Sequence, residues 1–441
     1  MKKDYLIPLI ILTGIILRLF VYCSGISFWG DEAALALNVI EKSYSDLFKG
    51  LDYLQVAPPM FLVMSKFIML DSLRDFSLRF IPLVSGIISV PLFYKFIQML
   101  SNSKKVILVS TFLFSFNMTA ILYCAQFKQY SLEFCVAILL LIIFYKILFQ
   151  NECKWYYPII IAISPWFSLS SLFIIGCYFF MVLIKTPKLV LKTYIPFFVS
   201  FIIFYFVSLK FIMNANYSGM YNWWQNGYGF VDLRHPLRVI IRVGELFSFD
   251  KTVAIFCGSI ILISLIKFDK KKLFLYLPIL LTFVASVLKL YPIQARLLLF
   301  LLPCFVGLIA EYDWKFAKEY LIIVCSMSFI TAFYYAINPH NIFFSTYSKE
   351  IVNIVENKRK YNEKIILDSS YYVYYYYIKD KSNVILLKND YDSNDCNAEI
   401  ENLPSGRYYL ISGKNIKTSL TKKVKILDEC NLFANTLYIE K

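Results

Sequence analysis

Histidine is almost absent from this chain of 441 residues, which contains only His235 and His340. Metal sites built from several histidines, and catalytic triads that need a histidine base, are therefore nearly excluded. The sequence also lacks a P-loop, a dinucleotide-binding glycine fingerprint and a His-Glu-x-x-His zinc motif. Acid and base chemistry in this protein must therefore be carried by carboxylates.

Charged residues are scarce as well. They make up 17% of the chain, whereas hydrophobic residues make up 59% and aromatic residues 18%. A soluble globular protein has about a quarter charged residues, and the mean hydropathy of this chain is +0.60. Because so much apolar surface can be buried only in lipid, we predict a polytopic α-helical membrane protein.

The formal net charge of +15 does not indicate a nucleic-acid partner. The lysines lie in short clusters between apolar runs, for example at 104–105 and 270–272. Such clusters mark the cytoplasmic side of a membrane protein, and here they predict a cytoplasmic N-terminus. No cleavage site with small residues follows the first apolar run, so we expect that run to be retained as a membrane span.

Apolar runs of roughly 17–25 residues predict about eleven transmembrane helices in a membrane domain that covers residues 1–338. The runs lie near residues 5–23, 78–98, 106–123, 131–149, 155–169, 170–184, 194–213, 252–266, 273–289, 297–311 and 319–337. Between them we predict a first outer loop at 24–77 and a long outer loop at 214–250. The stretch Pro58–Leu70 is apolar but short, and we expect it to form a helix in the outer membrane interface.

The composition becomes more polar after residue 338, and short strand patterns follow. The expected strands are Lys364–Leu367, Asn383–Leu387, Arg407–Ile411, Lys423–Leu427 and Thr436–Ile439, and the expected helical segments are 343–361, Tyr371–Ile378 and Asn415–Leu420. This alternation predicts a small α/β domain over residues 339–441, on the extracytoplasmic side. Cys396 and Cys430 are then available for a disulfide in an oxidising compartment.

Four motifs fall on the predicted outer side of the membrane. They are Trp29-Gly30-Asp31-Glu32-Ala33-Ala34, Gln55-Val56-Ala57-Pro58-Pro59-Met60-Phe61-Leu62, Gln126-Phe127-Lys128-Gln129-Tyr130-Ser131-Leu132-Glu133 and Tyr291-Pro292-Ile293-Gln294-Ala295-Arg296-Leu297-Leu298-Leu299-Phe300. The first motif opens the segment Asp31–Lys42, which we predict to be a short amphipathic helix with Asp31 at its N-cap.

Taken together, these motifs resemble those of the GT-C glycosyltransferases, which take sugars from polyprenyl-phosphate carriers. The resemblance is to the bacterial branch similar to protein O-mannosyltransferases and aminoarabinose transferases, and residues 5–150 carry most of it. It implies a GT-C-like fold, an inverting sugar transfer and undecaprenyl phosphate as the bacterial carrier. The chain departs from the family pattern at Ala57, where a histidine usually precedes the proline pair, and it has no Asp-x-Asp motif in the first outer loop.

Transfer of a sugar from a phosphodiester to a hydroxyl needs a base for the hydroxyl proton and a counter-charge for the departing phosphate. Asp31 is the candidate base, and Glu32 is a candidate to orient it or to bind a cation. Glu133 is a third candidate, because an ionised carboxylate at the end of a span is unfavourable without a function or a partner. Lys128 and Arg296 are the candidate phosphate ligands.

The remaining candidates concern substrate and metal. Gln55, Tyr130, Trp223 and Trp224 are possible substrate-binding residues. No cofactor is required by the pattern; a divalent cation, magnesium or manganese, would have Asp31 and Glu133 as its ligands.

Each candidate also has a purely structural interpretation. Asp31 would serve only as a helix cap, and Glu133 would only pair with Lys128 or Lys146. Arg296 would be an interfacial arginine with its charge in the headgroup layer. The Trp223-Trp224 pair would belong to an interfacial aromatic belt. The Tyr371–Tyr377 cluster is expected to pack the outer domain against the membrane region.

The sequence therefore predicts a multi-pass protein of the bacterial plasma (inner) membrane. Its expected function is to transfer a sugar from a polyprenyl-phosphate-linked donor to a glycan, lipid or protein acceptor of the cell envelope. The alternative is a transporter or flippase that grips lipid-linked saccharides with the same charges. A third interpretation, a scaffold for envelope assembly, predicts that no single charged residue is needed for activity.

Overall fold

A computed structural model describes residues 5–248, 250–266, 272–310, 317–338, 347–360, 362–367, 372–387, 400, 402–412, 425–430 and 435–440. The chain divides into two compact units. One, here called the helical unit, contains Met1–Gly25 and Glu41–Pro339; the other, here called the sheet unit, contains Ile26–Ile40 and His340–Lys441. The segment Ile26–Ile40, which carries the acidic pair, thus groups with residues more than 300 positions later in the chain.

Among the described residues, four helices are long and apolar enough to cross a membrane: Leu6–Cys23, Asp71–Leu100, Tyr130–Gln150 and Pro187–Asn214. They correspond to α1 (Leu6–Cys23), α4 (Arg74–Leu100) with the short turn before it, α7 (Tyr130–Gln150) and α10 (Pro187–Phe204) with its continuation. The protein is a membrane protein with a mostly helical fold, as predicted.

Further helices occupy the other predicted spans. They are α5 (Lys104–Ser115), α6 (Met118–Tyr123), α8 (Tyr157–Phe167), α9 (Ser171–Lys185), α13 (Lys251–Ile266), α14 (Leu273–Val287), α15 (Leu302–Ala310) and α16 (Ala317–Ile337). The number of helices that cross the membrane stays a prediction.

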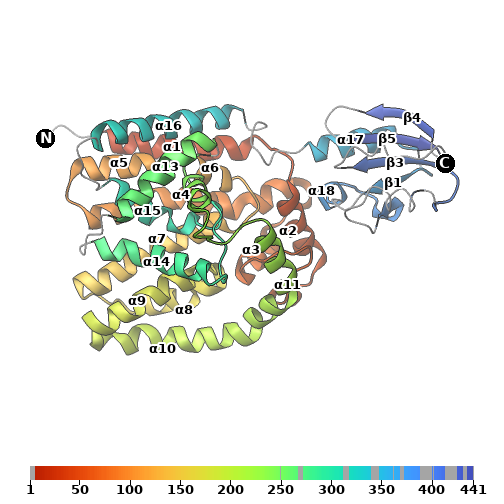
Figure 1. Cartoon of the computed structure of the whole chain (residues 1–441). Helices are drawn as coiled ribbons and strands as arrows, with labels where there is room; N and C mark the ends of the chain where they lie inside the picture. Colours follow the sequence, from red (N-terminus) through yellow and green to blue (C-terminus); the bar gives the residue numbers. More distant parts are fainter. Residues whose placement is uncertain are drawn as a thin grey trace. The chain divides into compact units, whose positions relative to one another are not determined.

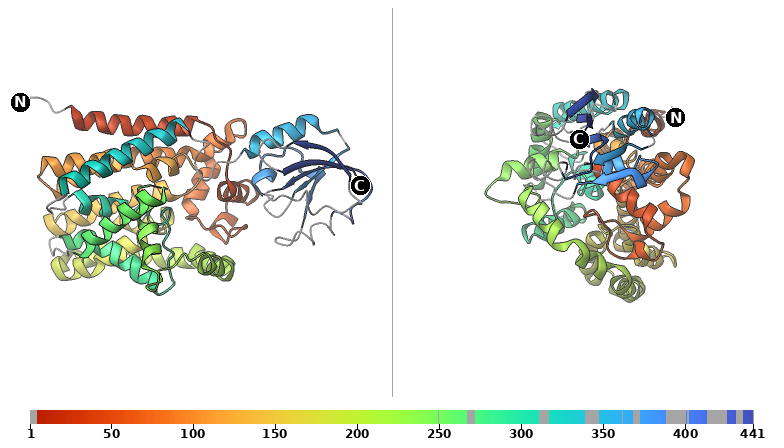
Figure 2. Two further views of the ribbon diagram at one scale, coloured as in Figure 1. Left: turned by 45° about the horizontal axis from the view of Figure 1, so that its top comes forward. Right: turned by 90° about the vertical axis from the view of Figure 1, so that its right-hand side faces the viewer.

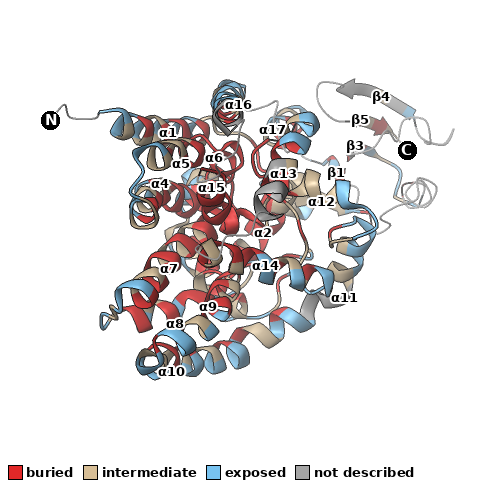
Figure 3. Cartoon of the chain, turned by 60° about the vertical axis from the view of Figure 1, so that its left-hand side comes forward, coloured by how far each residue is buried: buried red, intermediate tan, exposed pale blue. Residues whose placement is uncertain are grey.

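Helix α7 lies in the interior of the helical unit, where it packs against α4 and α9. Buried residues concentrate on the inner helices, whereas α10, which runs beside α8 and α9, is largely exposed (Figures 1 and 3). The exposed side chains of α10 are large and apolar, among them Leu191, Val199 and Ile202. Such a surface suits contact with lipid chains rather than water.

The predicted span 106–123 is interrupted, which corrects the expectation of one continuous helix. Helix α5 ends at Ser115, and α6 begins at Met118. Between them, Asn117 caps α6, because its side-chain oxygen accepts the Ala120 N–H at 2.9 Å, and its Nδ2 donates to the Leu246 carbonyl at 2.8 Å. The buried Arg18 of α1 also donates to the Ser115 carbonyl at 2.8 Å. This carbonyl lies at the end of α5, where carbonyls have no hydrogen-bond partner within the helix.

The ranges predicted as loops contain helices of their own. The helix predicted at Pro58–Leu70, within the predicted loop 24–77, is present as α3 (Pro59–Ile68), and the range 214–250 includes the end of α11 (Lys210–Asn226) and all of α12 (Pro236–Gly244). A π-helical turn at Tyr205–Leu209 joins α10 to α11. Helix α3 begins directly at the proline pair, where a proline is favourable because the first N–H groups of a helix have no internal partner.

The sheet unit contains five strands in the order β2-β1-β3-β5-β4. The strands are β1 (Lys364–Leu367), β2 (Val384–Leu386), β3 (Arg407–Ser412), β4 (Lys425–Cys430) and β5 (Asn435–Glu440). β1 pairs in parallel with β2 and β3, while β5 is antiparallel to both β3 and β4. The strands lie close to the predicted positions, and β1 and β2 are short apolar runs.

Alternation along the strands divides the buried side chains between the two faces of the sheet. Helix α17 (Ser348–Lys358) covers one face, where Ile351 and Val355 pack with Ile365 and Ile411 (Figure 2). The short helix α18 (Tyr372–Tyr375) follows β1 in the chain. The predicted helix Asn415–Leu420 lies outside the described residues, as do Cys396 and the side chain of Cys430, so the predicted disulfide is not described.

Candidate functional site

The acidic pair lies in the first turn of α2 (Gly30–Glu41), in the sheet unit. The helix starts at Gly30, one residue before the predicted N-cap, so Asp31 is not the capping residue. The Trp29 carbonyl instead accepts the first helical N–H groups. The Glu32 carboxylate reaches back to the Trp29 N–H at 3.5 Å, which is the reciprocal half of a capping box.

The two acids of this pair therefore differ in their surroundings. Glu32 is only 1% exposed, whereas Asp31 is partly exposed. Residues 32–39 are all buried, which corrects the prediction that this helix is amphipathic. Glu32 has the position of an anchor for the helix start, and Asp31 is the more exposed of the two carboxylates.

Lys128 lies in the irregular segment between α6 and α7, in the helical unit. Its side chain is 3% exposed, and its ammonium donates to the Gln55 Oε1 at 2.6 Å. The neighbouring Gln129 Nε2 donates to the Val56 carbonyl at 3.2 Å. These bonds bring two of the four motifs together, because they tie the residues before α7 to the residues before α3.

Gln55 itself is held by an unusual turn. The two preceding residues, Tyr53 and Leu54, have φ angles of 60° and 53°. A left-handed conformation is uncommon for residues other than glycine, and the backbone strain at each such residue costs on the order of 1–3 kcal/mol. Strain of this kind persists only where surrounding contacts fix the backbone, and it concentrates at functional sites.

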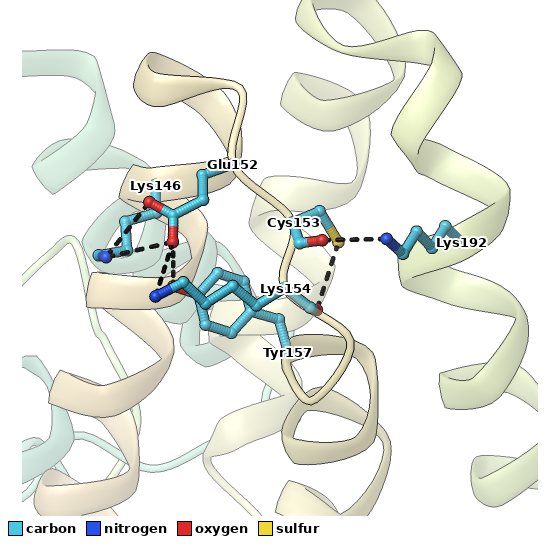
Figure 4. Close-up of polar contacts among 6 residues, drawn as sticks. All are labelled: Lys146, Glu152, Cys153, Lys154, Tyr157 and Lys192. Carbon is cyan, nitrogen blue, oxygen red and sulfur yellow. Dashed lines mark hydrogen bonds and ion pairs between the residues drawn. The ribbon is translucent and has the colours of Figure 1, made fainter.

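Glu133 is buried in the first turn of α7. Its carboxylate is hydrogen-bonded to Ser170, which directly precedes α9. Lys146, a partner considered for Glu133, instead pairs with Glu152 at the other end of α7, at 3.4 Å (Figure 4). A buried carboxylate in a membrane helix is unfavourable unless it has a function, so the position of Glu133 is consistent with the predicted catalytic role, which stays a prediction.

Tyr291 was not among the predicted site residues, although it opens the fourth motif. Its ring is close enough to Glu133 and Tyr130 to interact electrostatically with both. Burial, with a smaller contribution from Glu133, raises the pKa of Tyr291, so its hydroxyl stays protonated. That hydroxyl donates to the Leu297 carbonyl at 2.9 Å, which fixes the loop before Arg296. Tyr130 is buried and packs edge-on against Tyr123.

Arg296 is placed by Trp224 of α11. The guanidinium carbon lies 5.6 Å from the centre of the indole ring, a distance at which a cation–π attraction is effective. Trp224 is partly buried, whereas Trp223 is 61% exposed. The structure thus separates the two tryptophans, which the sequence treated as one pair, because adjacent residues on a helix point in different directions.

These contacts gather the candidates of the helical unit in one region. Lys128 reaches Gln55, and the adjacent Leu54 packs against α11, where a Cβ at Gly219 would come within 2.8 Å of its side chain. Helix α11 in turn supplies Trp224, which contacts Arg296. The loop that carries Arg296 also carries Tyr291. Tyr291 interacts electrostatically with Glu133 at the start of α7.

The described residues include many side chains of the kinds that bind metal ions. Among them, no three His, Cys, Asp or Glu side chains come together as a group that could hold a metal. Asp31 and Glu133, the two predicted ligands, belong to different units. Asp31 has one adjacent acid in the sequence, Glu32, and Glu133 has none.

Comparisons with known structures define the fold. ArnT from Cupriavidus metallidurans, solved bound to undecaprenyl phosphate, matches with a TM-score of 0.57 and 8% identity over 99% of this chain and 98% of that chain. The oligosaccharyltransferase AglB from Archaeoglobus fulgidus, solved with an inhibitory peptide and a dolichol-phosphate, matches with a TM-score of 0.52 and 12% identity. That match covers 93% of this chain and 70% of AglB.

The archaeal oligosaccharyltransferase was also solved with zinc and sulfate, and that structure gives a TM-score of 0.53 with 12% identity over 92% of this chain and 68% of its own. No protein-family model and no curated protein matches the chain. The predicted GT-C-like membrane fold is confirmed by these likenesses, which extend over nearly the whole chain.

Proposed function

We propose that this protein transfers a sugar from a polyprenyl-phosphate-linked donor to an acceptor of the cell envelope. The observation that carries the proposal is the shared fold with ArnT bound to undecaprenyl phosphate, over nearly the full length of both chains. AglB, solved with a dolichol-phosphate, has the same fold. A lipid-linked phosphate is thus the ligand common to two structures that this chain resembles.

The proposal places the protein in the bacterial plasma (inner) membrane as a multi-pass protein. Lysine clusters between the apolar runs support a cytoplasmic N-terminus. By the same alternation, residues 339–441 form an extracytoplasmic domain, and the reaction takes place on the outer face of the membrane. The acceptor is a glycan, a lipid or a protein.

Lys128 and Arg296 are proposed to hold the donor phosphate. Lys128 brings a positive charge into a buried part of the helical unit, where an electrostatic interaction is stronger than in water. Its bond to Gln55 fixes the direction of the ammonium group. Arg296 offers a planar fork that matches two phosphate oxygens, and its cation–π contact with Trp224 limits the number of orientations.

Asp31 is proposed to act as the general base. The acceptor oxygen attacks the anomeric carbon of the sugar, the bond from that carbon to the phosphate oxygen breaks, and the electron pair leaves with the polyprenyl phosphate. The hydroxyl proton passes to the Asp31 carboxylate. A single displacement of this kind inverts the anomeric centre, as the resemblance to the GT-C family implies.

Glu32 and Glu133 have supporting roles in this proposal. Glu32 anchors the start of α2 through the Trp29 N–H and so orients Asp31. Glu133, with Ser170 and Tyr291 as neighbours, is proposed to contact the sugar or the acceptor. Gln55, Tyr130, Trp223 and Trp224 remain candidate substrate-binding residues. A divalent cation stays a proposal, supported by the zinc in the archaeal structure.

The alternative function is a transporter or flippase for lipid-linked saccharides. It would use Lys128 and Arg296 to grip the headgroup, but it needs no base. The structures that share the fold, ArnT and an oligosaccharyltransferase, favour the transferase.

The test uses purified full-length protein in lipid nanodiscs. Binding of undecaprenyl phosphate is measured by native mass spectrometry, and transfer is measured with a panel of polyprenyl-phosphate sugars and an envelope extract from a strain that lacks the protein. Transfer by wild type but not by Asp31→Asn, with donor binding retained in both, supports the transferase. Vesicle translocation without any transfer would support the flippase, and absence of both binding and transfer would reject the proposal.

A further inference from the structure

The segment Ser27–Trp29, which leads directly into the acidic helix α2, is held by side chains from the far end of the chain. The Phe28 N–H donates to the Tyr377 hydroxyl at 2.7 Å, across 349 positions of sequence. The Phe28 carbonyl accepts from the Ser348 hydroxyl at 3.2 Å. Both backbone polar groups of Phe28 are thus bound by residues that surround the sheet, in the same compact unit.

The Phe28 side chain is held as firmly as its backbone. It is 0% exposed and stacks on Tyr376 with ring centres 4.9 Å apart and an interplanar angle of 21°. Tyr377 meets the same ring edge-on at 6.5 Å. The tyrosine cluster that the sequence assigned to packing against the membrane region therefore packs on the residue three positions before Asp31.

The residue before Phe28 is fixed to the start of α17. The Ser27 hydroxyl donates to the Glu350 carboxylate at 2.7 Å and accepts from the Lys349 N–H at 3.2 Å. The residue two positions after Phe28 is Gly30, where a Cβ would come within 3.3 Å of the Tyr372 ring. The approach of α2 to this ring is close enough to favour glycine at its first position.

We infer that the C-terminal part of the sheet unit, His340–Lys441, positions the general base. Tyr377 and Ser348 fix Phe28, and the helix that bears Asp31 begins two residues later. Because no flexible linker separates these contacts from Asp31, their loss displaces the carboxylate. A misplacement of about 1 Å can reduce a rate about a hundredfold. This inference rests on the proposed function, in which Asp31 is the base.

The competing interpretation is that residues His340–Lys441 bind the acceptor, and that their contacts with the segment before α2 have no role in catalysis. The two interpretations differ in the kinetic constant that they affect. A positioning residue lowers kcat and leaves donor affinity and the acceptor KM near their wild-type values. A residue that binds the acceptor raises the acceptor KM.

The experiment compares Ser348→Ala, Ser348→Thr and Tyr377→Phe in the full-length protein. Ser348→Thr keeps the hydroxyl and serves as the conservative rescue. Tyr408→Phe is the matched control, because the Tyr408 hydroxyl donates to the Pro404 carbonyl at 2.7 Å within the same unit but has no part in the segment before α2. Integrity of each variant is confirmed by its elution volume and melting temperature.

We expect Ser348→Ala and Tyr377→Phe to lower kcat about tenfold each, the effect of one lost hydrogen bond to a positioned group. Ser348→Thr and Tyr408→Phe should stay near wild type, and undecaprenyl-phosphate binding should be unchanged in all four. Unchanged kcat in both single variants would overturn the inference, and so would a raised acceptor KM with unchanged kcat.

Amide hydrogen exchange reports on the positioning of α2 without depending on sugar transfer. It therefore tests this inference independently of the proposed function. Amide exchange over residues 28–36 is compared between wild type and the variants by mass spectrometry. Faster exchange there in Ser348→Ala and Tyr377→Phe, but not in Tyr408→Phe, supports positioning of α2 even if no sugar transfer is found. Unchanged exchange in both variants overturns it, whether or not wild type is active.

Discussion

Lys128 donates a 2.6 Å hydrogen bond to Gln55, a residue 73 positions earlier in the chain. The bond joins the segment before α7 to the turn before α3, and it places an ammonium group in a buried region of the helical unit. The sequence did not predict that these two motifs are in contact, but in the structure they belong to one hydrogen-bonded arrangement. Its first consequence concerns the lipid donor.

Replacing Lys128 with alanine should weaken the binding of undecaprenyl phosphate about 10- to 100-fold, which is the usual effect of losing a hydrogen bond to a charged group. Gln55→Ala should have a smaller effect, because it frees the ammonium group without removing it. Affinity is measured by native mass spectrometry in nanodiscs. Lys49→Ala is the control, since Lys49 forms an exposed ion pair with Asp46. Equal affinities for wild type and Lys128→Ala would remove Lys128 from the donor site.

Asp31→Asn should lower kcat about 10²- to 10⁴-fold, which is the contribution of a general base, and leave donor affinity intact. Glu32→Gln should be milder, because a glutamine oxygen can still accept from the Trp29 N–H. Asp46→Asn provides a control carboxylate from an exposed turn. Rates come from transfer assays with saturating donor. If Glu32→Gln proved the more damaging change, the assignment of base and anchor would have to be exchanged.

Gly244 is required by close packing between α12 and α13. A Cβ at this position would lie 1.7 Å from the Ala254 carbonyl oxygen, which is backbone and cannot turn aside. Gly244→Ala should therefore destabilise the protein by about 1–3 kcal/mol or more, as overpacking does. Gly176→Ala is the matched control, because the nearest atom would be 4.0 Å away. Melting temperatures in one detergent test the difference, and an equal shift for both variants would contradict the packing.

Glu152 connects the end of α7 to the start of α8. The Tyr157 hydroxyl donates to it at 3.0 Å, and Lys146 and Lys154 lie within ion-pair distance (Figure 4). Hydrogen bonding from Tyr157, and less so from the two lysines, lowers the pKa of Glu152. A carboxyl whose pKa is lower in the folded state stabilises the fold above its unfolded pKa of about 4.3, and it loses that effect as the pH falls further.

The corresponding variant is Glu152→Gln. Its melting temperature should lie below that of wild type at pH 7, and the two should converge as the pH is lowered below about 4. The comparison is made by differential scanning fluorimetry from pH 7 to pH 3. A difference that persists unchanged to the lowest pH would show that the ionised form of Glu152 does not stabilise the fold.

The sequence predicted the fold best where the signal is local. Apolar runs located helices such as α1 and α7, and short β-patterns located strands such as β1 and β3, because both depend on neighbouring residues. The break at Asn117 was missed because the apolar run continues on both sides of it; there Asn117 caps α6 and also donates to the Leu246 carbonyl, far along the chain.

The candidate site shows the same division. Motif resemblance pointed to Asp31, Lys128 and Arg296, but not to what holds them. Tyr377 contacts Phe28 across 349 positions, and no periodicity or composition can reveal such a contact. The start of α2 at Gly30 rather than Asp31 is an ordinary error of one residue in a helix boundary, yet it changes which acid anchors the helix.

The contact between Arg296 and Trp224 predicts that a positive charge alone at this position does not give wild-type donor affinity. Arg296→Lys keeps the positive charge but loses the planar fork and the guanidinium contact with the indole ring. We expect its donor affinity to fall nearly as far as that of Arg296→Ala, whereas a simple interfacial charge would tolerate lysine. Trp224→Ala should weaken donor binding about 2- to 30-fold, the range of a cation–π contact, and more than Trp223→Ala, because Trp223 is 61% exposed. All four affinities are measured with undecaprenyl phosphate in the same nanodiscs. Wild-type affinity in Arg296→Lys would show that the guanidinium geometry does not contribute to donor binding. Arg296 would then be interpreted as an interfacial arginine.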